Sequence, residues 1–246
     1  MKRLRNALSL GIMIASICLS AYAQTAQEIL SLVDDNEIYS SISYEAEMHI
    51  SYQGKTFIKK IKGYGRENKD SFIEFINQED VGTKYLKKDG RLYVYSPDTE
   101  QVMLISGHML KESMMGSDYS YEDTIENDRL SKRYSSVVSG EEILGDRACW
   151  ILDLTALKST ESYPTQRLWV SKDTHEVLRF DLFALSGVRV KEYSLLESRL
   201  IKNRYFPVKS EMRDLMRKGS KTVFTMDKVE LDQKLSDSLF STRNLR

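Results

Sequence analysis

The chain has 246 residues, with 36 basic and 36 acidic side chains. Three of the basic residues lie in a short N-terminal segment that we expect to be removed, which leaves the mature chain slightly acidic. This charge balance gives no reason to expect a nucleic-acid partner. About 220 residues is enough to bury an ordinary hydrophobic core without disulfides or metals to support it.

The first 23 residues have the pattern of a cleavable secretory signal. Met1–Arg5 is positively charged and an apolar run follows from Ala7 to Leu19. Ala21-Tyr22-Ala23 then precedes Gln24 with the small-x-small spacing at which signal peptidase cuts. The apolar run of about 13 residues is shorter than the roughly 20 that span a bilayer. We therefore expect export and a mature protein that begins at Gln24.

Cys18 leaves a second possibility open, a lipoprotein signal whose cysteine becomes acylated. Ile17 stands before Cys18 where such a signal normally has Gly or Ala, so lipid attachment is the less favoured alternative. After cleavage only Cys149 remains, which excludes an internal disulfide. Its neighbours Ala148 and Trp150 are apolar, so we predict a buried structural thiol.

One helix and then a series of strands are expected along the chain. Residues 24–35 form an apolar stripe at helical spacing. From Ile42 to Tyr52 apolar and polar residues alternate, which indicates a strand with one buried face, and 56–64 returns after the turn at Gly54. Further strands are predicted at 71–77, 83–87, 91–95, 101–105, 135–143, 148–157, 166–170, 177–185, 188–195, 208–216 and 222–231.

Successive hairpins of this kind predict a mainly β protein with a few helices (α+β), built on a curled antiparallel sheet. No Pro- or Ser-rich linker divides the chain. We therefore expect a single domain from residue 24 to residue 246.

Residues 107–129 show neither strand alternation nor a long helical stripe. An apolar cluster of Met109, Leu110, Met114 and Met115 is expected on a helical turn, and Ser120 with Asp123 has the spacing of a helix-capping pair. Irregular segments of this length inside compact domains are often functional lids. We expect this segment to cover a binding surface.

Motifs of covalent or metal chemistry are missing from the sequence. The three histidines, His49, His108 and His175, lie on separate elements, and no nucleophile elbow or phosphate loop is present. We therefore expect neither an enzyme nor a metal or cofactor. Methionine adapts to irregular apolar ligands, so we take the apolar residues of the first strand and of the lid region as candidates for lipid binding. They are Tyr44, Met48, Ile50, Met103, Met109, Met114 and Met115.

Four segments resemble the outer-membrane lipoprotein-sorting protein family, the LolA-like group. They are Leu92–Pro97, Val102–Gly107, Met115–Asp123 and, near the end, Asp237–Ser241. The resemblance implies an incomplete β-barrel, open on one side and lidded by helices, with an apolar concavity that holds lipid. It also implies a periplasmic protein that ferries lipoproteins or lipids between membranes, sometimes alongside large export complexes of the inner membrane.

The most specific part of this resemblance consists of Gly116, Ser117, Asp118, Ser120, Tyr121 and Asp123. Their Ser and Asp side chains could cap turns and clasp the lid, or they could contact the ligand directly. The leading hypothesis is a carrier or chaperone for an acylated lipoprotein or lipid. The alternative is a protein-binding accessory or envelope-stress sensor whose cavity is filled by its own side chains.

Overall fold

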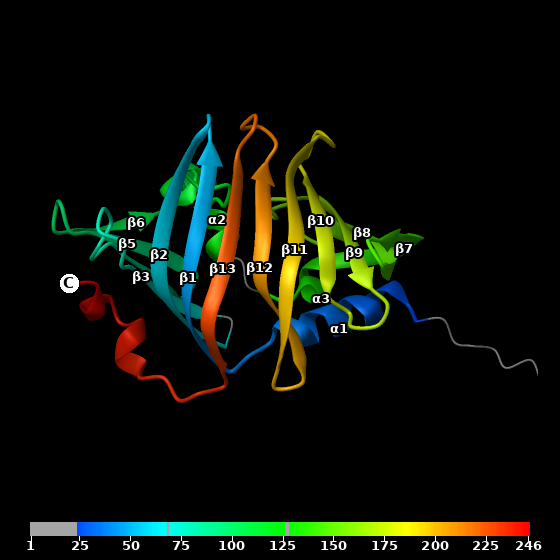
Figure 1. The fold of residues 1–246 in the computed structure, drawn as a ribbon, viewed down its shortest axis with the longest axis horizontal. Coiled ribbons are helices and arrows are strands. Elements are labelled where there is room, and N and C mark those ends of the chain that lie inside the picture. The colour runs from blue at the N-terminus through cyan, green and yellow to red at the C-terminus, as the bar shows by residue number, and fades with distance from the viewer. Residues whose placement is uncertain (1–23, 68, 126–127) are drawn as a thin grey trace, which may run out of the picture.

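The computed structural model describes residues 24–67, 69–125 and 128–246. The predicted signal, with Cys18, lies outside these residues. Figure 1 shows a curled sheet with helices on its concave side. No helix in the described ranges is both long and apolar enough to cross a membrane.

Thirteen strands make up the sheet in the described part of the chain. In chain order they are β1 (Ser41–Tyr52), β2 (Lys55–Arg66), β3 (Asp70–Phe75), β4 (Lys84–Lys88), β5 (Arg91–Ser96), β6 (Gln101–Ile105), β7 (Tyr134–Leu144), β8 (Arg147–Ala156), β9 (Thr165–Ser171), β10 (Val177–Phe183), β11 (Arg189–Ile201), β12 (Arg204–Asp214) and β13 (Lys221–Leu231). The helices are α1 (Ala26–Glu37), α2 (Tyr121–Ile125) and α3 (Leu130–Arg133), with 3₁₀ turns η1 (Gly107–Lys111), η2 (Met114–Gly116), η3 (Asp237–Phe240) and η4 (Thr242–Leu245).

The strand order is β6-β5-β4-β3-β2-β1-β13-β12-β11-β10-β9-β8-β7. Except for β6 and β7, strands that follow one another in the chain pair as antiparallel neighbours, and β1 joins the two halves by pairing with β13. Because β6 and β7 stand at opposite ends of this order, the barrel is not closed. The predicted curled antiparallel sheet is confirmed.

Two predicted strands were too short. The strand predicted at 188–195 continues in the structure to Ile201, and the strand predicted at 208–216 already begins at Arg204. Lys202 and Asn203, both with positive φ, form the tight turn between them. Proline usually interrupts a strand because it cannot donate a ladder hydrogen bond. Here Pro207 lies beside a shift in the β11–β12 register, which allows the strand to continue past it.

The alternation predicted for the first strand matches its burial. Ala46, Met48 and Ile50 are buried on the concave side, whereas Glu47 on the other face forms an ion pair with Lys60. Side chains from β2 to β6 and Met114 of η2 complete this core, which lies beneath the segment from 107 to 121. The concave face is therefore apolar beneath the segment that we predicted to be a lid.

Helix α1 begins with a capping box. The Thr25 side chain accepts a hydrogen bond from the Glu28 backbone N–H, and the Glu28 carboxylate accepts one from the Thr25 N–H. This cap sets the start two residues after the predicted one. Ile29, Leu30 and Val33 then pack against β7, β8 and β9, so α1 covers one half of the concave face.

The C-terminal turns cover part of the outer face. Phe240 and Leu245 are fully buried against Phe72 of β3 and Leu86 of β4, and Lys88 donates a hydrogen bond to the Phe240 carbonyl.

Cys149 is buried near Trp169 and Leu178, as predicted for a structural thiol.

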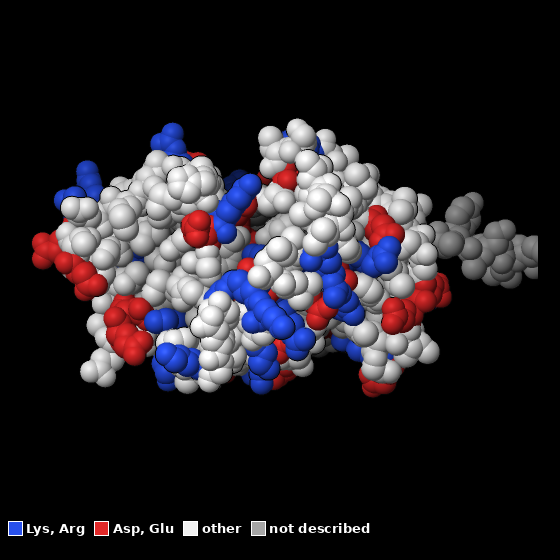
Figure 2. Space-filling view, turned by 90° about the horizontal axis from the view of Figure 1, so that it is seen from above, with Lys and Arg blue, Asp and Glu red and all other residues white. Residues whose placement is uncertain are grey.

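The hairpins β1–β2, β10–β11 and β12–β13 all turn at the same end of the molecule (Figure 1). Figure 2 views this end and shows side chains of both charges among larger uncharged areas. Leu185 and Met216 are exposed at two of these turns.

Candidate ligand-binding cavities

Two cavities lie on the concave side of the sheet, one of about 420 Å³ and one of about 250 Å³. Tyr39, Tyr119 and Asp123 line both of them, so the cavities adjoin at the lid. Ligand pockets in proteins commonly have volumes of about 300–1,000 Å³. The larger cavity reaches that size alone, and the smaller one extends it.

The smaller cavity is bordered by strands from the first half of the sheet and by the lid. Its apolar walls are Ile42, Tyr44, Met48, Ile61, Ile73, Met114 and Phe224. The Tyr44 ring packs edge-on against Phe224 and lies across Gly63 of β2. A Cβ at position 63 would lie 2.1 Å from that ring, so the glycine makes room for it.

The larger cavity lies between α1, α3 and strands β9 to β12. Its apolar walls include Leu168, Phe180, Leu182, Phe206, Pro207 and Met212. Phe180 stacks on Tyr193 with ring centres 4.4 Å apart. The Asp34 carboxylate accepts hydrogen bonds from the backbone N–H groups of Leu130 and Ser131, at 2.8 and 3.0 Å, and so joins α1 to α3 above the cavity.

The segment from Ser113 to Ser120 forms a clasp. Gly116 has a φ of +77°, which turns the chain back so that Met114 donates a hydrogen bond to the Tyr119 carbonyl at 2.8 Å. Arg217, from the turn between β12 and β13, donates to the carbonyls of Gly116 and Ser117. The turn of the clasp is therefore tied to one end of the sheet.

Asp118 attaches the clasp to the sheet a second time. Its carboxylate accepts hydrogen bonds from the Thr222 hydroxyl at 2.7 Å and from the Asp214 backbone N–H at 3.0 Å. The Thr222 hydroxyl in turn accepts from the Asp118 N–H at 2.9 Å. Both side chains are buried, so this contact replaces water on each partner.

The predicted pair of Ser120 and Asp123 is a reciprocal cap at the start of α2. The Asp123 carboxylate accepts from the Ser120 N–H at 2.7 Å, and the Ser120 hydroxyl accepts from the Asp123 N–H at 3.3 Å. Asp123 also forms a buried ion pair with Lys191 of β11 and accepts a hydrogen bond from the Tyr163 hydroxyl at 2.8 Å. One carboxylate thus caps α2 and holds it against the opposite half of the sheet.

Glu37, the last residue of α1, lines the larger cavity. The residue is exposed, while the surrounding cavity walls remove part of the hydration of its carboxyl group. Loss of hydration, with the nearby Asp34 carboxylate as a second cause, raises the pKa of the Glu37 carboxyl to about 7. Burial likewise raises the pKa of Tyr44 and Tyr119 to about 12, so both hydroxyls stay neutral.

The structure brings some of the predicted lipid-binding residues together and separates others. Tyr44, Met48 and Met114 line the smaller cavity, and Ile50 and Met115 belong to the core beside it. Met103 and Met109 are 43% and 38% exposed and line neither cavity, so their part in lipid binding stays a prediction. Methionine content alone did not indicate which way these side chains face.

The sequence left two roles open for the motif residues, clasping the lid or contacting the ligand, and the structure divides the residues between them. Gly116, Ser117, Asp118 and Ser120 form hydrogen bonds of the clasp and cap, while Asp123 does so and also lines both cavities. Tyr121 packs against the core, with its ring 5.9 Å from that of Tyr85. Tyr119, which lines both cavities, was missed although it lies inside the motif.

Among the residues that the structure describes, no group of three or more His, Cys, Asp or Glu side chains is arranged to hold a metal ion. The unclosed sheet, the helices on its concave side and the apolar cavities beneath them have the architecture of the LolA-like fold. Solved structures confirm the predicted resemblance to this group at the level of the fold.

A family model described as "Uncharacterized protein" matches residues 67–246, most of the chain, and the chain belongs to that family. A DUF1329 family protein from Desulfovibrio piger is 29% identical with a TM-score of 0.82, over 89% of this chain and 97% of its own. A domain assigned to outer membrane lipoprotein sorting from Vibrio parahaemolyticus is 16% identical with a TM-score of 0.79, over the same shares. A LolA superfamily protein from Nitrosomonas europaea is 20% identical with a TM-score of 0.74, over 90% of this chain and all of its own. No curated protein matches the chain.

Proposed function

We propose that this protein is a periplasmic carrier that holds the acyl chains of a lipid or lipoprotein in its two adjoining cavities. The observation that supports this most directly is the pair of cavities of about 420 and 250 Å³ with largely apolar walls. The predicted secretory signal and the lipoprotein-sorting name of the Vibrio parahaemolyticus domain support the same proposal.

Binding would be reversible partition of acyl chains, without covalent chemistry. Each methylene removed from water contributes about 0.8 kcal/mol, so a partly enclosed chain is held firmly. Release then requires the cavity to open. The contacts that would have to yield are those of the lid, Asp118 with Thr222 and Asp123 with Lys191. Exchange with an inner-membrane export complex stays a prediction from the family resemblance.

The alternative is a protein-binding accessory or stress sensor on the same fold. That hypothesis predicts a concavity filled by the protein's own side chains. The larger cavity instead keeps about 420 Å³ between α1 and the sheet. The open volume favours the carrier.

Native mass spectrometry of protein purified from its own cell envelope tests the carrier proposal. We expect lipid or acylated peptide to copurify, and added acylated peptide to raise the melting temperature of delipidated protein. A ligand-free mass, together with no change in melting temperature, would refute the proposal. Crosslinking in cells would then show whether the captured partner is a protein, as a sensor requires.

A further inference from the structure

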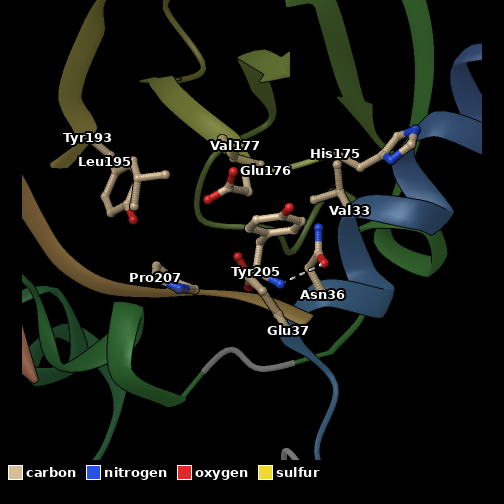
Figure 3. A pocket seen from close by; sticks show the side chains of 10 residues that line it. All are labelled: Val33, Asn36, Glu37, His175, Glu176, Val177, Tyr193, Leu195, Tyr205 and Pro207. Carbon is tan, nitrogen blue, oxygen red and sulfur yellow. Dashed lines mark hydrogen bonds between the residues drawn. The ribbon is translucent and has the colours of Figure 1, made fainter. Parts of the chain in front are cut away.

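A small side pocket of about 10 Å³ opens between the end of α1 and strands β10, β11 and β12 (Figure 3). It shares Glu37, Val177, Tyr193 and Pro207 with the larger cavity. The pocket is therefore a side chamber of that cavity. Its volume is that of one water-sized group.

The walls of the side pocket are joined by Asn36. Its amide nitrogen donates a hydrogen bond to the Thr174 carbonyl at 2.8 Å, and its amide oxygen accepts one from the Tyr205 N–H at 3.3 Å. These bonds fix α1 both to the turn before β10 and to β12. The pocket is thus formed by the fold itself.

The side pocket contains a buried carboxylate, and one of its two oxygens accepts no hydrogen bond from the described residues. The Glu176 side chain is only 4% exposed, and Figure 3 shows it between the side chains of Tyr193 and Tyr205. Its Oε2 accepts hydrogen bonds from Arg147 and from the Thr174 hydroxyl. Its Oε1 has no hydrogen-bond partner within the described chain.

Glu176 stays ionised at neutral pH. Burial alone raises its pKa, but the hydroxyls of Ser198 and Thr174 and the Arg147 guanidinium outweigh burial and lower the net pKa below the usual range. The Ser198 hydroxyl is close enough for this effect but makes no hydrogen bond with Oε1. A buried charged oxygen without a donor is costly, so the position favours a ligand that donates a hydrogen bond.

The surroundings of Oε1 favour a positively charged donor. Arg147 offsets the charge of Glu176, and Glu37 at the rim supplies a second carboxyl group, whose ionised form a bound cation would favour. Glu37 is also the last residue of α1, and the C-terminal end of a helix attracts cations. Tyr193 and Tyr205 also line the pocket, and aromatic rings attract cations.

We propose that the side pocket binds the primary ammonium group of an acylated ligand whose chains lie in the larger cavity. This inference rests on the proposed carrier function and specifies the ligand's polar end. Two sources have the required chemistry: the headgroup of an ethanolamine phospholipid, and the free α-amine of a diacylated lipopeptide. An ammonium group has the size of a water molecule and donates three hydrogen bonds, one of which would go to Oε1.

The test compares two pairs of probes with identical acyl chains: a diacyl phosphatidylethanolamine and its N-acetyl derivative, and a diacylated lipopeptide with a free or an acetylated α-amine. Displacement of a fluorescent fatty acid from the full mature protein gives each affinity. We expect about tenfold tighter binding of the free amine in at least one pair. The pair that shows the preference identifies the source.

In Glu176→Gln the preference should fall to less than twofold while the acetylated probes bind as before. Glu197→Gln, on the solvent side of β11, is the matched control and should keep the preference. If Glu176→Gln does not fold, Glu37→Gln at the rim should still reduce the preference about threefold. Equal affinity for free and acetylated probes in the natural protein overturns the ammonium site but leaves the carrier intact. Failure of all four probes to bind overturns both proposals.

Discussion

At the scale of single residues, the absence of a side chain at Gly63 helps to shape the smaller cavity. The Tyr44 ring occupies the place where a Cβ of residue 63 would stand. Because the ring lies against β2 and against Phe224, it forms part of the cavity wall without filling the cavity. Gly63 and Gly65 had no assigned role in the sequence, since a strand glycine indicates a close contact without naming its partner.

Glu37 should make stability depend on pH in the direction opposite to most surface carboxylates. Its pKa in the folded protein is about 7, against 4.5 for an unperturbed glutamate. Between these values the folded state keeps a proton that the unfolded state releases, so stability falls as pH rises through this window. We expect Glu37→Gln to raise the melting temperature relative to the natural protein, by an increasing amount from pH 5 to pH 7.5.

Glu28 on the same helix provides the contrast for that experiment. Hydrogen bonds from the Thr25 backbone and hydroxyl lower its pKa, so its stabilising effect is lost as pH falls. Glu28→Gln should therefore lower the melting temperature most at neutral pH and least in acid. If the difference in melting temperature between Glu37→Gln and the natural protein stays constant from pH 5 to pH 7.5, this would contradict the raised pKa of Glu37.

At the scale of elements, the lid is formed by turns that are too short to be stable alone. Isolated helices need about 12–15 residues to persist, whereas α2 has five residues and α3 has four. Their positions are set by contacts with the sheet, chiefly those of Asp118 and Asp123. The lid should therefore respond to changes made in the strands.

Thr222→Val should loosen the lid from the strand side. The substitution keeps the shape of the side chain but removes the hydroxyl that pairs with the buried Asp118 carboxylate, at a cost of about 1–3 kcal/mol. Hydrogen exchange should accelerate in residues 107–121 and stay unchanged in β10 and β11. Thr225→Val, further along the same strand, is the matched control. Equal exchange of the lid in both variants would show that this contact does not hold it.

The strands could be predicted because alternation along a strand directly reflects which face is buried, as Met48 and Glu47 show. Helix α1 was predicted for the same reason, from its apolar stripe. The short helices of the lid could not be predicted in the same way. The capping pair of Ser120 and Asp123 marks the start of one helix, but no local pattern shows where a helix of four or five residues ends. The register shift that admits Pro207 into β12 also depends on a partner strand, β11.

The candidate site was predicted in part, for a related reason. Tyr44 and Met48 could be placed because they share the buried face of a long alternating strand. Phe180 and Tyr193 lie on strands that were also predicted, but their stacking across β10 and β11 depends on the register between those strands. The lining of the larger cavity comes from helices and strands far apart in the chain, and only the folded sheet brings them together.

At the scale of the whole molecule, the curvature of one continuous sheet creates two adjoining cavities of different character. The smaller lies within the first half of the strands, and the larger lies under α1 in the second half. Lid residues Tyr119 and Asp123 stand where they meet. A ligand with two acyl chains could place one chain in each cavity, and a single chain could cross from one to the other.

Blocking each cavity separately should show how the chains are divided. Ile73→Trp would project a large ring into the smaller cavity, and Leu182→Trp would do so in the larger one. If a ring displaces about two methylenes at 0.8 kcal/mol each, affinity should fall about tenfold. Displacement of a fluorescent fatty acid measures this, with Met103→Trp on the exposed edge strand β6 as the matched control.

The pattern of losses distinguishes the possible arrangements. If one chain lies in each cavity, both variants should weaken a two-chain lipid, and a single-chain fatty acid should be affected by only one of them. If a single chain crosses between the cavities, either block should weaken both ligands equally. A tryptophan ring cannot share either cavity with an acyl chain. If Ile73→Trp and Leu182→Trp fold, as judged by melting temperature, yet bind both ligands as tightly as Met103→Trp does, the ligand must lie elsewhere.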